Sequence, residues 1–247
     1  MARSIFGGKN TSTEIATGVD ASTGATNVSK LLTRYTTLEL SGSLSTSLPT
    51  GLTSGVVGSG AVAIITDNTM GGIRMHTGAT NSSRAFFYNT GAAGLNPLIS
   101  GFKNTTATVS LEFDIELINW LNGAVGTFAG FWDNGTASGT LLGTAANVIG
   151  VRWKDATTAE FVCDKAGTEG KTDLTFSITD GDAHHVKIVI TSTSASCTVD
   201  DVAAITNSTA TQLPIVPLGI GFNTSNAAAG GVIQVLKITN IRWYTDP

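Results

Sequence analysis

Residues 174–201 read LTFSITDGDAHHVKIVITSTSASCTVDD. The Asp-Gly-Asp at 180–182 is a turn sequence. It is followed by an alternating, β-branched run at 184–190, a short Ser/Thr segment, and a second alternating run at 196–200. Two such runs separated by a few polar residues predict an antiparallel hairpin with one buried face. This stretch therefore predicts a β-sheet protein.

The same rhythm of short β-rich runs and Gly, Asn, Ser and Thr punctuation extends over the chain from Tyr35 onward. No segment shows a convincing helical stripe. The expected strands lie at 36–40, 61–65, 71–75, 84–89, 106–117, 126–132, 148–153, 159–163, 174–178, 184–191, 196–200, 217–222 and 231–244. This many strands in one chain of 247 residues predict two antiparallel sheets packed face to face.

The hairpin resembles the "DG-x-WH-x-V … VDG" hairpin of laminin G-like and concanavalin A-like jelly-roll domains. His185 matches the His of that pattern, whereas His184 stands where Trp is usual and Asp201 where Gly is usual. Two later segments, LPIVPLGIGFN at 213–223 and VIQVLKITNIRW at 232–243, resemble strands of the same family. The resemblance covers roughly the last third of the chain and implies an all-β jelly-roll sandwich. It speaks for the fold, because lectins, adhesion modules, glucanases and virus structural proteins share it.

Residues 1–33 differ from the rest, since they mix small and polar residues with few large apolar ones and no sustained period. We expect an extended N-terminal arm there, followed by a sandwich domain at 34–247. The arm has basic and apolar anchors suited to docking on a partner: Arg3, Phe6, Lys9 and Ile15.

A candidate catalytic row lies in SLEFDIEL at 110–117. The glucanase branch of the family carries an E-x-D-x-E strand whose first Glu is the nucleophile and whose last is the acid/base. Glu112, Asp114 and Glu116 match that pattern, and their period of two places them on one sheet face. However, a retaining glycosidase needs carboxyl groups about 5 to 5.5 Å apart, whereas residues i and i+4 of a strand lie about 13 Å apart. We therefore expect the polar face of an ordinary strand, with a glycoside hydrolase as the alternative.

Glycan binding without hydrolysis is a further alternative, because Trp120, Trp132 and Trp153 could stack on sugars. The implied partner is then a surface glycan. Laminin G-like domains often bind calcium at a loop rim, but the acidic pairs Asp180/Asp182 and Asp200/Asp201 do not supply the about six convergent oxygens that a hard cation needs. We expect no metal and no cofactor.

The composition excludes several classes of partner. Charged residues make up 13% of the chain, against roughly 25% in typical soluble proteins, and Thr is more frequent even than Gly, with its 29 copies. A net charge of −4 gives no general attraction to nucleic acid or to an anionic membrane. No run reaches the roughly 18 apolar residues of a membrane span, and no secretory signal is expected at MARSIFGGKNTSTE. The two cysteines, Cys163 and Cys197, are expected to be buried free thiols.

A weakly charged surface, an arm rich in Gly, Ser and Thr, and a lectin-like sandwich together resemble structural proteins of tailed bacteriophages. The resemblance implies a non-enzymatic capsid decoration protein or head/tail fibre component, a homo-oligomer, most simply a trimer, that contacts capsid or tail proteins in the virion. An extracellular lectin-like adhesin is the alternative.

Overall fold

The computed structural model describes about half of the chain. The described residues are 38–40, 52–59, 61–65, 72–77, 83–89, 108–118, 127–133, 147–153, 159–174, 181–216, 218–225 and 235–246. The expected arm at 1–33, with Arg3, Phe6, Lys9 and Ile15, lies outside them, as does Trp120.

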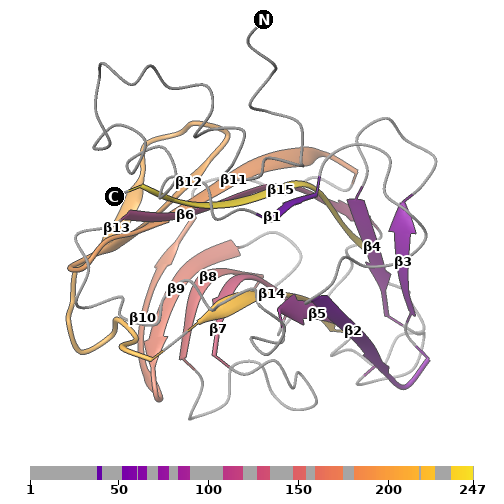
Figure 1. Ribbon diagram of the computed structural model, residues 1–247, viewed down its shortest axis with the longest axis horizontal. Helices are drawn as coiled ribbons and strands as arrows, with labels where there is room; N and C mark the ends of the chain where they lie inside the picture. The colour runs from indigo at the N-terminus through magenta and orange to yellow at the C-terminus, as the bar shows by residue number, and fades with distance from the viewer. Residues whose placement is uncertain are drawn as a thin grey trace, which may run out of the picture.

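Two antiparallel sheets form two layers (Figure 1). Sheet A has the order β13-β12-β11-β6-β15-β4-β3, and β1 also pairs with β15. Sheet B has the order β10-β9-β8-β7-β14-β5-β2. The strands of sheet A are β1 (Leu38–Leu40), β3 (Ala61–Ile65), β4 (Gly72–His76), β6 (Thr108–Ile118), β11 (Ala183–Ile190), β12 (Ala195–Val199), β13 (Ile205–Asn207) and β15 (Val235–Asp246). Those of sheet B are β2 (Leu52–Val57), β5 (Arg84–Asn89), β7 (Thr127–Trp132), β8 (Asn147–Trp153), β9 (Ala159–Lys165), β10 (Thr168–Asp173) and β14 (Gly219–Ser225).

The main core fills the space between the sheets. On β6, the alternate residues Leu111, Phe113, Ile115 and Leu117 are at most 1% exposed, because successive side chains of a strand point to opposite faces. Rings from both sheets meet there. Phe222 of sheet B stacks on Phe87 and meets Phe113 of sheet A edge to face, arrangements that aromatic pairs prefer.

Sheet B differs from sheet A because its central strands are buried on both faces. Every described side chain of β7 is buried, and almost every one of β8 and β9. On the face turned away from the main core, which we call the outer face of sheet B, a second apolar cluster packs together: Phe128, Trp132, Val148 and Val162, with the half-buried Phe86 against it. This face therefore carries a small core of its own.

The hairpin predicted at 184–200 is present as β11 and β12. Its Ser/Thr turn is closed by a hydrogen bond from the Thr191 N–H to the Ser194 carbonyl, and the Thr191 hydroxyl accepts from the Ser194 N–H. The following Asp200 and Asp201 both have positive φ, 50° and 58°, a conformation that Asp tolerates better than most residues. Asp201 thus occupies a left-handed site at the position where the hairpin pattern that this sequence resembles has Gly.

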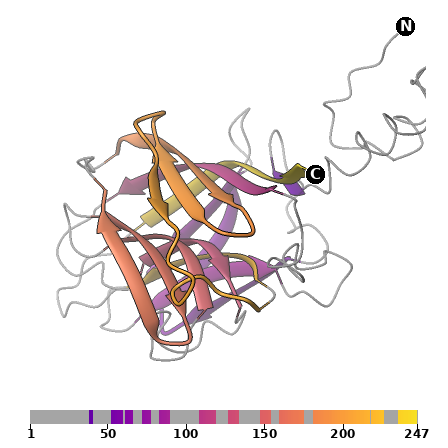
Figure 2. The same cartoon turned by 90° about the vertical axis from the view of Figure 1, so that its left-hand side faces the viewer.

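The sequence did not predict strands β2, β10 and β13, because they lack a clear alternation of apolar and polar residues. Strand β10 reads TEGKTD and is mostly exposed, so no apolar alternation marks it. Figure 2 shows the end of the sandwich where β10 lies, with β11 and β12 of sheet A above the β9–β10 hairpin of sheet B. There Gln212, just after β13, donates to the backbone of Glu169 and joins the edges of the two sheets.

The strand expected at 174–178 is not found at Leu174, which lies outside any strand, and the rest of that segment is not among the described residues. The part of the chain that the structure describes contains no helix. No helix there could therefore cross a membrane. The prediction of an all-β sandwich of two antiparallel sheets is confirmed.

Candidate functional site

The carboxylate row of β6 lies on the outer face of sheet A, opposite the main core. Glu112, Asp114 and Glu116 are each half-buried and alternate with the fully buried apolar residues of the same strand. The neighbours of β6 are β11 on one side and β15 on the other. Each carboxylate can therefore reach side chains of two adjacent strands.

The two glutamates lean to opposite sides of β6. Glu112 pairs with Lys187 of β11 at 2.8 Å, whereas Glu116 pairs with Lys237 of β15 at 2.9 Å. Leaning apart adds to the about 13 Å that separates i and i+4 along a strand. A retaining glycosidase needs its two carboxyl groups at about 5 to 5.5 Å, so this arrangement is unlike that of a catalytic pair.

Asp114 is held between the same two strands. One oxygen contacts Nδ1 of His185 at 2.7 Å, and the other accepts from the side-chain amide of Asn240. The pairing of β15 with β6 shifts register between Thr239 and Arg242, and Asn240 there has a φ of 52°. Bulges of this kind redirect a side chain, and here the redirected amide reaches Asp114.

A second His–Asp contact continues the network toward β12. Nδ1 of His184 lies 2.6 Å from one oxygen of Asp200, and the backbone N–H of His185 donates to the other. Burial alone would raise the pKa of Asp200, but these bonds and the charge of the two histidines outweigh it and hold the pKa below its usual value. The two histidines of the opening sequence thus brace the sheet through carboxylates.

The two described tryptophans that were proposed for sugar stacking lie on opposite faces of sheet B. Trp153 is fully buried in the main core between the sheets, so no sugar can stack on it, and the prediction is wrong for this residue. Trp153 follows Arg152 on an alternating strand, and the alternation turns it inward. Trp132 instead lies on the outer face of sheet B, 5% exposed.

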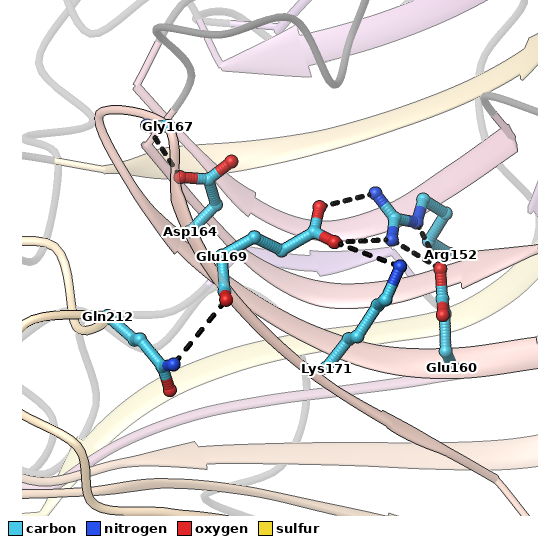
Figure 3. Close-up of polar contacts among 7 residues, drawn as sticks. All are labelled: Arg152, Glu160, Asp164, Gly167, Glu169, Lys171 and Gln212. Atoms are coloured by element: carbon cyan, nitrogen blue, oxygen red, sulfur yellow. Dashed lines mark hydrogen bonds and ion pairs between the residues drawn. The ribbon is translucent and has the colours of Figure 1, made fainter.

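A polar cluster that the sequence analysis did not identify lies on that outer face (Figure 3). Arg152 of β8 is its centre. Its Nε donates to Glu160 of β9 at 2.6 Å, and its two terminal nitrogens donate to the two oxygens of Glu169 of β10 at 2.7 and 3.0 Å. Lys171 also contacts Glu169, at 3.4 Å. The guanidinium therefore uses all three of its nitrogens within the cluster.

Burial and charge shift the ionisation of this cluster. Desolvation lowers the pKa of Arg152, but its bonds to Glu169 and Glu160 outweigh this and raise the pKa above the usual value. The bond to Arg152 is the main cause that holds the pKa of Glu169 below its usual value. Burial raises the pKa of Asp164, the register partner of Glu169, although Asp164 accepts from the Gly167 N–H.

Glu160 is the most enclosed member of the cluster. It is 2% exposed, and Arg152 binds its Oε1. Its Oε2 is buried too, and among the described residues no hydrogen-bond partner reaches it. Buried polar atoms in proteins nearly always have a partner, which makes this oxygen unusual.

Glycines set the position of the aromatic rings beside the cluster. A side chain at Gly150 would place its Cβ 2.6 Å from the Phe128 ring, and one at Gly221 would meet the Trp132 ring at 2.7 Å. Both rings therefore occupy the space directly above a glycine of the next strand. Only Gly permits a ring to lie so close to the backbone.

The sequence carries one signal for this cluster that could have been used. Arg152 and Glu160 are single charges inside otherwise apolar strands, VIGVRW and AEFVC, and charges in such positions are rarely buried unless paired. Glu169 and Lys171 give no such signal, because β10 is polar throughout. Among the described residues, no group of three or more His, Cys, Asp or Glu could hold a metal ion.

Comparisons with known proteins find similarity in structure only. No protein-family model matches the sequence, and no curated protein is significantly similar to it. Among solved structures, peanut lectin aligns with a TM-score of 0.55 at 16% identity, covering 85% of this chain and 97% of the lectin. A protein of unknown function from Shewanella oneidensis aligns at 0.55 and 15%, covering 90% and 95%.

An endo-β-1,4-glucuronan lyase from the fungus Trichoderma reesei aligns with a TM-score of 0.53 at 11% identity, covering 85% of this chain and 94% of the lyase. Identities this low establish the fold and leave the activity open. The chain therefore has the concanavalin A-like jelly-roll fold that its opening hairpin resembles.

Proposed function

We propose that this protein is a non-enzymatic structural component of a tailed-bacteriophage virion, a capsid decoration protein or a head/tail fibre component. The observation that carries the non-enzymatic part is the pairing of the β6 row. Glu112, Asp114 and Glu116 each bind a side chain of a neighbouring strand, so their charges stabilise sheet A instead of facing a substrate.

The virion part of the proposal rests on composition. Only 13% of the residues are charged, and a large share of the described charges pair with one another on the two outer faces. The polar composition is therefore mainly one of hydroxyl and amide side chains, which cost less to desolvate against other subunits than charges do. The arm at 1–33 would dock on capsid or tail proteins, and the sandwich at 34–247 would project from a particle assembled in the host cytoplasm.

Immuno-electron microscopy tests this proposal directly. Antibodies against the sandwich are applied to particles released from the host that carries this gene. We expect labelling at regular positions on the head or the tail. Purified particles without label and without the protein by mass spectrometry would contradict the proposal.

A glycan panel tests the enzymatic alternative. We expect the wild-type protein to release no oligosaccharides from β-glucans or other polysaccharides. Release by the wild type that is lost in Glu112→Gln and in Glu116→Gln would make the protein a glycoside hydrolase, because removal of a nucleophile or a general acid lowers the rate by orders of magnitude.

A carbohydrate-binding module, extracellular or on a virion fibre, is the second candidate. It keeps Trp132 as its candidate stacking residue on the outer face of sheet B, although only 5% of that side chain is exposed. Sugar sites typically combine apolar surface with a few fixed polar groups. The lectin among the structural neighbours has the same fold and adds no further support.

A further inference from the structure

We propose that the side of the sandwich where β2 and β3 lie is the surface through which copies of this chain associate, with an edge strand of one copy adding to a sheet of the next. The inference rests on the homo-oligomer that is part of the proposed function, and it gives that association a surface and a mode of contact. It does not depend on which part of a virion the protein occupies.

Both sheets end on this side of the molecule. β2 is the last strand of sheet B and β3 the last strand of sheet A, and residues 58–60 connect the two. Figure 1 shows β3 at the margin of one layer and β2 at the margin of the other. Within the described residues, β2 pairs only with β5 and β3 only with β4. The other side of an edge strand presents a row of N–H and C=O groups with which a further strand can pair.

These two edges lack the features that usually keep an edge strand from pairing. Natural proteins protect their sheet edges with charged side chains, with proline or with very short strands. Residues 40–66 contain no Asp, Glu, Lys, Arg or His. The strands themselves read LTSGVV and AVAII, without a proline.

The opposite side of the sandwich has such protection. The edge of sheet B there is β10, which carries Glu169, Lys171 and Asp173. The edge of sheet A there is β13, which is 3 residues long. Gln212 also joins the two edges by donating to the backbone of Glu169. The contrast within one molecule favours the side of β2 and β3 for association.

Apolar surface is exposed at β2. Val56 is the register partner of Ala85, which is fully buried in the main core, so Val56 lies on the core-facing side of sheet B. Its side chain is nevertheless 47% exposed. Ser54, two residues earlier on the same side of the strand, is exposed as well. A strand added beside β2 would cover Val56 and remove this apolar surface from water.

The partner that fits these edges is a second copy of the chain. A charged partner strand would have to desolvate its charges against a surface that offers no opposite charge. An edge strand of a second copy brings no charge and pairs through its backbone, as in other cases of strand addition. Because each copy has two such edges on one side, a closed assembly can use both edges of every copy.

Size-exclusion chromatography with light scattering tests this surface in the full-length variant Val56→Lys. Lysine on an edge strand opposes pairing with another strand, and Val56 is exposed enough to accept the longer side chain. We expect the wild type to elute as an oligomer. At the same protein concentration, Val56→Lys should elute with the mass of a single chain, 25.3 kDa.

Thr172→Lys is the matched control. Thr172 is exposed on β10, the opposite edge strand of the same sheet, and its register partner Phe161 lies in the main core. The control therefore places the same charge on the same face of sheet B at its other edge, and its mass should equal that of the wild type.

Hydrogen exchange of the wild type replaces the variant should Val56→Lys not fold. The exchange is measured at protein concentrations above and below the point of association. We expect residues 52–65 to gain protection in the oligomer and residues 168–173 to stay unchanged.

The outcomes separate this surface from self-association itself. An oligomer that persists in Val56→Lys, one that is lost in both variants, or protection confined to other segments would overturn this surface and keep self-association. Protection of residues 52–57 that is independent of concentration and is lost on deletion of residues 1–33 would make the chain's own arm the occupant, and would overturn the proposal. A wild type that stays a single chain at high concentration would overturn the surface and the homo-oligomer together, whereas antibody labelling of particles tests the virion role separately.

Discussion

Cys163 of sheet B and Cys197 of sheet A both lie in the main core as free, buried thiols. Burial raises the pKa of each to about 12, and for Cys197 the nearby charge of an ionised Cys163 adds to the effect. The thiolate is the reactive form, so a thiol held neutral and buried is inert. The expectation of buried free cysteines is confirmed.

We predict that neither thiol reacts with Ellman's reagent in the native protein at pH 8, and that both react after unfolding in guanidinium chloride. The change in absorbance counts the thiols in each state. An intramolecular disulfide found by mass spectrometry in the native protein would contradict this prediction. It would also favour the extracellular alternative.

Gly221 shows how a single residue leaves room for an aromatic ring on the outer face of sheet B. The three atoms nearest to an added Cβ there all belong to the Trp132 side chain, the closest at 2.7 Å. We predict that Gly221→Ala lowers the free energy of unfolding by about 2 kcal/mol, the usual size of an overpacking penalty. Urea denaturation measures the loss.

The background variant Trp132→Leu provides the control, because it removes the ring that the new methyl group meets. In that background Gly221→Ala should cost much less, and the difference measures the coupling between the two positions. Equal losses in both backgrounds would show that the backbone, and not the ring, requires glycine there.

At the scale of the element, β10 is an exposed edge strand held to sheet B by its pairing with β9. Its side chains bury little apolar surface, so polar contacts carry more of its attachment. The contact between Glu169 and Arg152 is bidentate, the strongest form of a guanidinium–carboxylate pair. Glu169 therefore ties the edge strand to the interior of the sheet.

The lowered pKa of Glu169 makes this attachment depend on pH. A carboxyl group with a folded pKa below its unfolded value of about 4.3 stabilises the fold above that value, and the contribution is lost as pH falls through the folded pKa. We predict that Glu169→Gln costs about 1 kcal/mol at pH 7 and less than that at pH 3. Urea titrations at both pH values measure this. The same loss at pH 3 as at pH 7 would mean that packing, and not charge, is what Glu169 supplies.

At the scale of the whole molecule, the sparse charge of the surface favours association with copies of the same chain. Charged residues are depleted at the centres of protein interfaces because each must be desolvated there. We predict a homotrimer for the full-length protein, measured by size-exclusion chromatography with light scattering. A mass of a single chain, 25.3 kDa, at high protein concentration would contradict it.

Deletion of residues 1–33 tests the division of the chain. We predict that the shortened protein keeps the melting temperature of the full-length protein within a few degrees, because the first described strand begins at Leu38 and the composition of the arm cannot support a core. It should no longer attach to particles. A melting temperature many degrees lower would place the arm in the fold.

The sequence by itself determined the strands whose alternation is clear, above all the hairpin of β11 and β12 and the long β6, because burial of one sheet face imposes a period of two. It also determined which face of β6 carries the carboxylates. It did not determine their partners, since Lys187, Lys237 and Asn240 are far away in the chain and reach β6 only through strand pairing. In the sequence alone, the row is a series of closely spaced carboxylates. In sheet A, lysines of the neighbouring strands lie beside its two glutamates.

Only the tertiary structure brought Arg152, Glu160 and Glu169 together, because adjacent strands in register align single charges that lie apart in the sequence. Only the tertiary structure likewise distinguishes the two tryptophans, Trp132 and Trp153. Each ends an apolar strand, but Trp153 shares the face of the main core and Trp132 does not. A strand pattern shows that two faces exist, and only the packing of one sheet on the other decides which face is the interior.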